Sequence, residues 1–122
     1  MLLQIQERTI EPDIAVVELS GKLALGRESQ RIETVVDQMV RQGRSKAVLD
    51  MTQVVYIDSA GIGLLALAAG RMKEFGGKLA IVAPEGRVLE MLKMTQMTAI
   101  LTVVNTLQEA VSAVCGAEAA SA

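Results

Sequence analysis

The sequence predicts one α/β domain, in which a mixed sheet of four or five strands packs against helices. Two observations lead to this class. A pair of strand-like runs near the amino terminus is separated by a short turn, which indicates an antiparallel hairpin. Apolar runs then alternate with stretches of helical periodicity, which indicates parallel strands joined by crossover helices. The chain of 122 residues fits a single domain. We predict a domain over residues 1–115 and a disordered tail over residues 116–122.

The predicted hairpin lies at the start of the chain. Leu3 to Gln6 alternates apolar and polar residues, as a half-buried strand does, and Ile14 to Leu19 is apolar enough for a central strand. Glu11-Pro12-Asp13 is a turn signal between them, and Ser20-Gly21 is predicted to end the second strand. Lys22 to Gly26 is then a connecting loop.

The rest of the chain alternates helices and strands. A helix is predicted from about Arg27 to Gly43, because apolar residues recur there at helical spacing and glycine commonly ends a helix. The charged residues of this helix are expected to face solvent: Glu28, Arg31, Glu33, Asp37 and Arg41. The later predicted elements are a strand at Ala47–Asp50, a second apolar run at Val54–Ile57, a helix from Ser59 to about Glu74 capped by Asp58, a strand at Lys78–Ala83, a helix at Glu85–Lys93, a strand at Ala99–Val103, and a helix at Thr106–Val114 capped by Asn105.

Composition argues against an enzyme. The chain has no histidine, which removes the commonest general base and the commonest metal ligand, and it has one cysteine, Cys115. Gly61-Ile62-Gly63 lacks the basic residue and further glycines of a nucleotide-binding loop. No cofactor or metal is therefore predicted. Charges of both signs are spread along the chain and the net charge is -2, so no nucleic-acid surface is expected.

The expected location is the cytoplasm. Met1-Leu2-Leu3 lacks the basic start of a signal peptide. The longest apolar run, Ile62 to Gly70, is far shorter than the ~20 residues that span a bilayer. A single cysteine fits a reducing compartment, where Cys115 acts as a small buried apolar residue. Membrane insertion is therefore not predicted.

The most informative stretch is Asp58-Ser59-Ala60-Gly61-Ile62-Gly63, which follows a strand and opens a helix. Asp58 can cap that helix by accepting hydrogen bonds from first-turn amides. Two glycines in the opening turns each cost roughly 1 kcal/mol relative to alanine, so a close approach to the backbone is expected. The residues alone fit two interpretations. One is a capped helix packed on a neighbouring element, and the other is an exposed Ser59 hydroxyl that serves as a modification or docking point.

This stretch resembles the phosphorylation-site motif of the STAS domain family, the bacterial anti-sigma factor antagonists. The family motif is Asp-Ser, then Ser or Thr, then Gly, an aliphatic residue and Gly. The order of elements also resembles that family from about Leu2 to Val114, including Leu19-Ser20-Gly21-Lys22-Leu23 and Phe75-Gly76-Gly77-Lys78-Leu79. The resemblance implies an STAS-like domain over residues 1–115 and phosphorylation at Ser59.

The resemblance implies a switch between partners. The unphosphorylated protein would bind an anti-sigma factor serine kinase and so free a sigma factor for transcription. The kinase, which binds the ATP, would then phosphorylate Ser59 and release the protein, and a PP2C-type phosphatase would reverse the modification. The partner-binding residues implied by the motif and by the preceding loop are Lys22, Leu23, Asp58, Ser59, Ala60, Gly61, Ile62 and Gly63.

Two departures from the family pattern bear on this interpretation. Ala60 stands where the family often has a second Ser or Thr, which confines phosphorylation to Ser59. Gly21-Lys22-Leu23-Ala24 stands where many members have Gly-Glu-Leu-Asp, so the partner contacts of that loop differ. An alternative is a constitutive STAS accessory subunit of an ABC lipid transporter or of a stress-signalling complex, which would use the same surface without a switch.

Overall fold

The computed structural model describes residues 3–10, 13–24 and 27–121, without the side chains of residues 27–29 and 116–121. The predicted turn at Glu11-Pro12, the loop residues Leu25-Gly26 and the side chain of Glu28 therefore lie outside the described part. The elements in chain order are β1 (Gln4–Ile10), β2 (Ile14–Leu23), α1 (Arg27–Arg41), β3 (Lys46–Ile57), α2 (Ser59–Phe75), β4 (Lys78–Val82), α3 (Arg87–Met94), a 3₁₀ turn η1 (Met97–Ala99), β5 (Thr102–Val104) and α4 (Leu107–Ser121).

One sheet carries the strands in the order β1-β2-β3-β4-β5. β1 pairs with β2 in antiparallel fashion, and each later neighbouring pair is parallel. The mixed α/β architecture predicted from the sequence is confirmed, with five strands and four α-helices in the described residues. The parallel pairs follow from the crossover helices, since a strand can return parallel to its neighbour only through a long connection.

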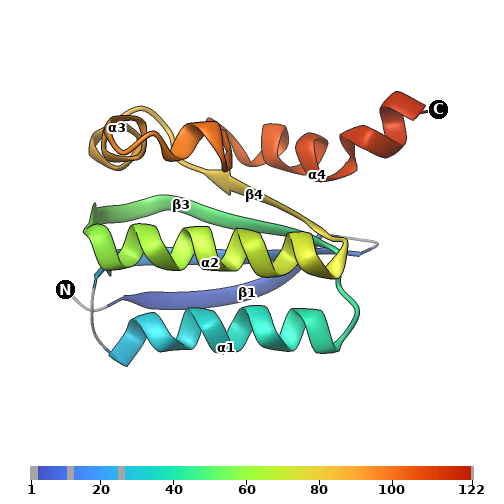
Figure 1. Cartoon of the computed structure of the whole chain (residues 1–122), viewed down its shortest axis with the longest axis horizontal. Helices are drawn as coiled ribbons and strands as arrows, with labels where there is room; N and C mark the ends of the chain where they lie inside the picture. The colour runs from blue at the N-terminus through green and yellow to red at the C-terminus, as the bar shows by residue number, and fades with distance from the viewer. Residues whose placement is uncertain (1–2, 11–12, 25–26, 122) are drawn as a thin grey trace.

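Helices cover both faces of this sheet. In Figure 1, α1 and α2 lie side by side on one face, and α3 and α4 lie on the other. On the α1–α2 face the sheet contributes residues such as Val17, Leu49 and Ile81 to an aliphatic core that also includes Leu65 of α2. A second, smaller cluster joins α4 to the opposite face through Val16, Val48 and Ala110, among others. Within the described residues, no helix is both long enough and apolar enough to cross a membrane.

β2 is longer than predicted. Ser20-Gly21 does not end the strand, which continues to Leu23 and stays paired with β3. Gly21 has a φ of 95°, a left-handed value that glycine adopts without steric cost, so the strand changes direction there without stopping. Lys22 and Leu23 are therefore strand residues, and the prediction of a loop from residue 22 was wrong.

β3 is one strand of 12 residues that joins the two apolar runs. Its pairing register with β2 shifts twice. Residues 51–52 together lie opposite Leu19, and Val55 is an extra residue between the paired residues Val54 and Tyr56. Such bulges bend a strand and redirect its side chains. The first bulge is held by Asp50, whose Oδ1 accepts hydrogen bonds from the Thr52 amide at 3.0 Å and the Thr52 hydroxyl at 2.6 Å. The bulges redirect the end of β3 towards the start of α2.

In the carboxyl-terminal third of the chain, the boundaries of the helices and strands differ from those predicted. Residues 97–99 form η1, so β5 begins at Thr102 and not at Ala99. The backbone of α4 continues to Ser121, past the predicted helix end near Val114. The division into a domain over residues 1–115 and a disordered tail over 116–122 stays a prediction, and Ala122 lies outside the described residues.

The cap of α4 is Thr106, not Asn105 as predicted. The Thr106 hydroxyl accepts a hydrogen bond from the Glu109 amide at 3.1 Å. In return, Oε1 of Glu109 accepts hydrogen bonds from the Thr106 amide at 3.1 Å and the Asn105 amide at 3.2 Å. This reciprocal pair is a capping box, which satisfies amides that would otherwise lack a partner in the first turn.

Replacing the capping hydroxyl should destabilise the protein. Thr106→Ala should lower the free energy of unfolding by about 1 kcal/mol, because the Glu109 amide loses its acceptor. Ser112→Ala is the matched control, since Ser112 is exposed in the middle of the same helix and alanine is the better helix former. Urea unfolding followed by circular dichroism measures both variants. Equal stability of Thr106→Ala and the unmodified protein would show that this hydroxyl contributes nothing to the cap.

Candidate functional site

The ends of β2 and β3 and the start of α2 meet at one end of the sheet. Leu23 and Ile57 are the last paired residues of the two strands. One residue later, the Asp58 amide donates a hydrogen bond to the Leu23 carbonyl at 3.3 Å. The chain then enters α2 at Ser59. This junction holds the predicted motif in one backbone conformation relative to the sheet.

Asp58 is the N-cap of α2, as predicted. Its backbone is extended, with φ −113° and ψ −175°, and its Oδ1 accepts a hydrogen bond from the Gly61 amide at 2.9 Å. Its carbonyl accepts the first helical hydrogen bond, from the Ile62 amide, also at 2.9 Å. The side chain therefore fixes where the helix starts and keeps Ser59 at the first helical position.

The two glycines of the motif have different environments. A Cβ added at Gly61 would lie 2.2 Å from the Leu23 carbonyl oxygen and 2.9 Å from Cγ1 of Ile57. The close approach expected from the sequence is thus made at Gly61 by the chain's own second strand. A Cβ at Gly63 would meet nothing within 4 Å. Gly61 is required for packing, whereas Gly63 leaves open space on the surface.

Ser59 is exposed and Ala60 is half-buried beside it. As the first residue of a 17-residue helix, Ser59 lies at the positive end of the helix dipole, next to first-turn amides. The first turn of α2 contains no acidic residue. The amino end of the helix dipole favours a phosphate on this hydroxyl, and the carboxylate of the adjacent Asp58 opposes it.

The other predicted partner-binding residues divide between surface and core. Leu23 and Ile62 are buried, so in this conformation they support the junction from beneath. Lys22 is exposed, and its Nζ lies 6.0 Å from the centroid of the Tyr56 ring. These two residues are direct neighbours across the β2–β3 ladder.

Val55 and Tyr56 were not singled out from the sequence. They are 54% and 41% exposed, although both are large hydrophobic residues that lie just before the motif, separated from Asp58 by Ile57. Exposed aromatic residues are frequent anchors of protein interfaces. The available signal was the run Val54-Val55-Tyr56-Ile57, which breaks the alternation expected of a half-buried strand. This run implies either that an apolar side chain is exposed or that the pairing register of the strand shifts, and it does not distinguish the two.

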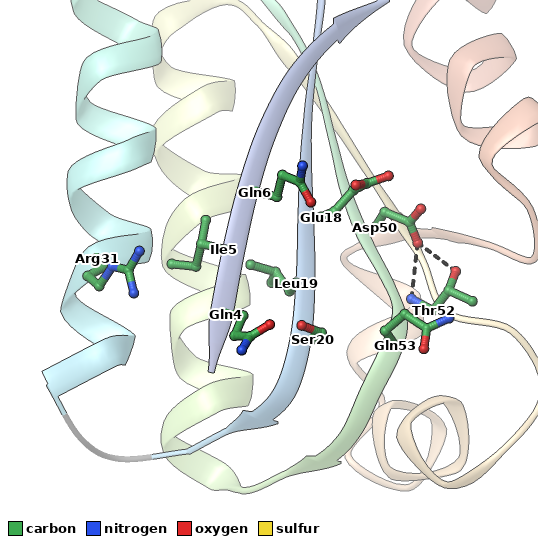
Figure 2. Close-up of a pocket in the computed structure, with 10 residues that line it drawn as sticks. All are labelled: Gln4, Ile5, Gln6, Glu18, Leu19, Ser20, Arg31, Asp50, Thr52 and Gln53. Atoms are coloured by element: carbon green, nitrogen blue, oxygen red, sulfur yellow. Dashed lines mark hydrogen bonds between the residues drawn. The ribbon is translucent and has the colours of Figure 1, made fainter. Parts of the chain in front are cut away.

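A polar pocket of about 630 Å³ opens on the sheet beside this junction (Figure 2). Glu18 and Asp50 lie directly opposite each other on β2 and β3, which is an unfavourable arrangement for two carboxylates. Each is compensated within the chain, since Arg8 Nε donates to Glu18 Oε2 at 3.1 Å and Thr52 donates to Asp50. The described residues contain no cluster of histidine, cysteine or carboxylate side chains that could hold a metal ion. The carboxylates thus have structural partners. The residues lining the pocket are Gln4, Ile5, Gln6, Glu18, Leu19, Ser20, Arg31, Asp50, Thr52 and Gln53.

The family model of the STAS domain matches residues 6–110, which is most of the chain. The chain belongs to the STAS domain family. A Thermotoga neapolitana protein, provisionally named an anti-sigma factor antagonist, is 30% identical over 107 residues, covering 88% of this STAS chain and 95% of the relative. The match spans the junction and confirms the resemblance from which the motif was interpreted.

Solved structures show the same fold. The crystal structure of a Thermotoga maritima protein, also provisionally named an anti-sigma factor antagonist, superposes with a TM-score of 0.81 at 23% identity, covering 90% of this chain and 93% of the other. The anti-sigma factor antagonist SpoIIAA in its unphosphorylated form superposes with a TM-score of 0.68 at 18% identity over 87% and 92% of the two chains. The phosphorylated form of SpoIIAA, from Bacillus, gives 0.69 at 17% identity over 91% and 99%.

The two glycines of this STAS domain provide a matched pair of variants. Gly61→Ala should lower the free energy of unfolding by about 1–3 kcal/mol, because the new methyl group overlaps a backbone carbonyl that cannot rotate away. Gly63→Ala should raise it by about 0.5–1 kcal/mol, since alanine gains helix propensity in open space. Urea unfolding compares the two. If Gly61→Ala were as stable as Gly63→Ala, the contact with Leu23 would not constrain the junction.

Proposed function

We propose that this STAS protein is an anti-sigma factor antagonist switched by phosphorylation of Ser59. Without phosphate it binds an anti-sigma factor serine kinase and so releases a sigma factor. Transfer of phosphate from ATP on the kinase to the Ser59 hydroxyl then separates the two proteins, and a PP2C-type phosphatase reverses the modification. The observation that carries the proposal is an exposed serine held at the first position of a capped helix, within the family motif.

The contact surface is formed by the exposed part of the junction. Ser59 and Gly63 are exposed on the first two turns of α2, and the open space at Gly63 allows a partner's main chain to come close. Lys22, Val55 and Tyr56 extend this surface from the strand ends. Asp58, Gly61, Ile62 and Leu23 hold the surface in position. In this proposal these four residues affect partner binding indirectly, because they fix the positions of the exposed residues.

Phosphate would act at the interface and leave the fold intact. It adds about -1.5 to -2 charges and three bulky oxygens on a surface that must desolvate when the partner binds. The helix itself tolerates the charge, because its amino terminus attracts anions. Weakening the complex a hundredfold requires only about 2.8 kcal/mol, which like-charge repulsion and desolvation can supply. The existence of SpoIIAA structures in both phosphorylated and unphosphorylated forms supports such a switch in a protein of this fold.

The first test compares three baits in affinity capture from native lysate: the unmodified protein, Ser59→Asp and Ser45→Asp. Ser45 is exposed just before β3, at the far end of a 12-residue strand that spans roughly 40 Å, so it controls for added charge. The unmodified and Ser45→Asp baits should retain a serine kinase, identified by mass spectrometry, and Ser59→Asp should lose it. Retention of one partner, such as an ABC-transporter ATPase, by all three baits would instead favour a constitutive accessory subunit.

A second test separates interface from folding. Ser59→Asp should change the free energy of unfolding by less than about 1 kcal/mol, because the helix dipole favours the added charge and the adjacent Asp58 carboxylate opposes it. Urea unfolding at low and high salt measures this, and the change should shrink at high salt. A larger destabilisation of Ser59→Asp would mean that its loss of partner binding reports unfolding, and the proposed interface mechanism would have to be abandoned.

A further inference from the structure

A groove of about 410 Å³ lies at the edge of the sheet farthest from β1. It exists because β4 pairs with β3 from Lys78 onwards, whereas β5 pairs with β4 only from Ala80, so the first residues of β4 are not flanked by a strand. The end of α2 and the middle of α4 form its walls, and they lie on opposite faces of β4 in Figure 1. We call it the edge groove. Its lining residues are Ala69, Lys73, Gly77, Lys78, Leu79, Ala80, Ile100, Thr102, Ala113 and Val114.

The buried and half-buried side chains of the edge groove are apolar, whereas its exposed rim includes polar residues. Ala80 and Val114 are buried at its base, and Leu79 and Ala113 are half-buried along its walls. Ile100 lies on the rim and is 69% exposed. A bound apolar group would cover this β-branched side chain and remove its exposed surface from water.

Among the side chains that the structure describes, two charged residues line the edge groove, and both are cationic. They are Lys73 at the end of α2 and Lys78 at the start of β4, and both are exposed. The groove is therefore locally cationic in a chain whose net charge is -2. Small-molecule sites typically combine an apolar cavity of roughly 300–1,000 Å³ with a few polar groups that orient the ligand, and the edge groove fits this description.

We propose that the edge groove binds a small amphipathic anion, an unbranched alkyl carboxylate for which octanoate is the probe. The alkyl chain lies on Ala80, Val114 and Leu79 and covers Ile100, and the carboxylate pairs with Lys73 and Lys78. Charge complementarity selects an anion over a neutral or cationic amphiphile, and the apolar floor selects an alkyl chain over inorganic phosphate. This site is separate from Ser59, because the two lie at opposite ends of α2, whose 17 residues span about 25 Å.

The test titrates the ¹⁵N-labelled full chain with sodium octanoate and follows its amide resonances. Saturable shifts should map to residues 77–80, 100–102 and 113–114, with a Kd of about 1 mM or tighter. Hexanoate should bind about tenfold more weakly, because two methylenes leave the groove. Octanamide, the neutral analogue, should bind at least about fivefold more weakly, because it cannot pair with the lysines.

Variants locate the site. Lys73→Gln combined with Lys78→Gln should weaken octanoate binding about fivefold, whereas Lys93→Gln, a matched exposed lysine on α3, should leave it unchanged. Ser59→Asp should also leave octanoate binding unchanged, so a failure of this proposal is separate from a failure of the switch. Absence of saturable shifts, equal binding of octanamide and octanoate, or shifts that map to the polar pocket of Figure 2 would each overturn the proposal.

Discussion

The contact between Gly61 and the Leu23 carbonyl is the constraint on which the functional end of the molecule depends. Any side chain at residue 61 would come within 2.2 Å of that oxygen, so α2 can start where it does only with glycine there. The same carbonyl accepts the Asp58 amide, and Asp58 in turn caps the helix through the Gly61 amide. Strand end, cap and helix start are thus one interlocked unit, and the position of Ser59 follows from it.

Sequence reasoning reached much of this unit because its signals are local. An aspartate before a helix, a serine after it and glycines in the first turn each have a short-range physical meaning, and the cap at Asp58 and the close approach at Gly61 were recovered on that basis. The mixed sheet was predicted from apolar, strand-like runs that alternate along the chain with stretches of helical periodicity. Thr106 and Glu109 also carried a local signal, a Thr-x-x-Glu capping box, which the choice of Asn105 overlooked.

What the sequence could not show depends on pairing between distant residues. Ser20-Gly21 reads as a break, yet pairing with β3 carries the strand through to Leu23, with the left-handed Gly21 absorbing the change of direction. The two register shifts of β3 likewise depend on its neighbour. They decide which residues of the strand end are buried, so the exposure of Val55 and Tyr56 and the burial of Leu23 could not be read from alternation alone.

The position of Tyr56 has an optical consequence. The chain has no tryptophan and only this one tyrosine, so its tyrosine fluorescence originates at the junction next to Ser59. The ring is partly in water and lies under the Lys22 ammonium. Any molecule that covers this end of the sheet changes the solvation and quenching of the ring, whereas events at the far end of α2 do not touch it. The protein therefore carries its own label-free chromophore for docking at the junction.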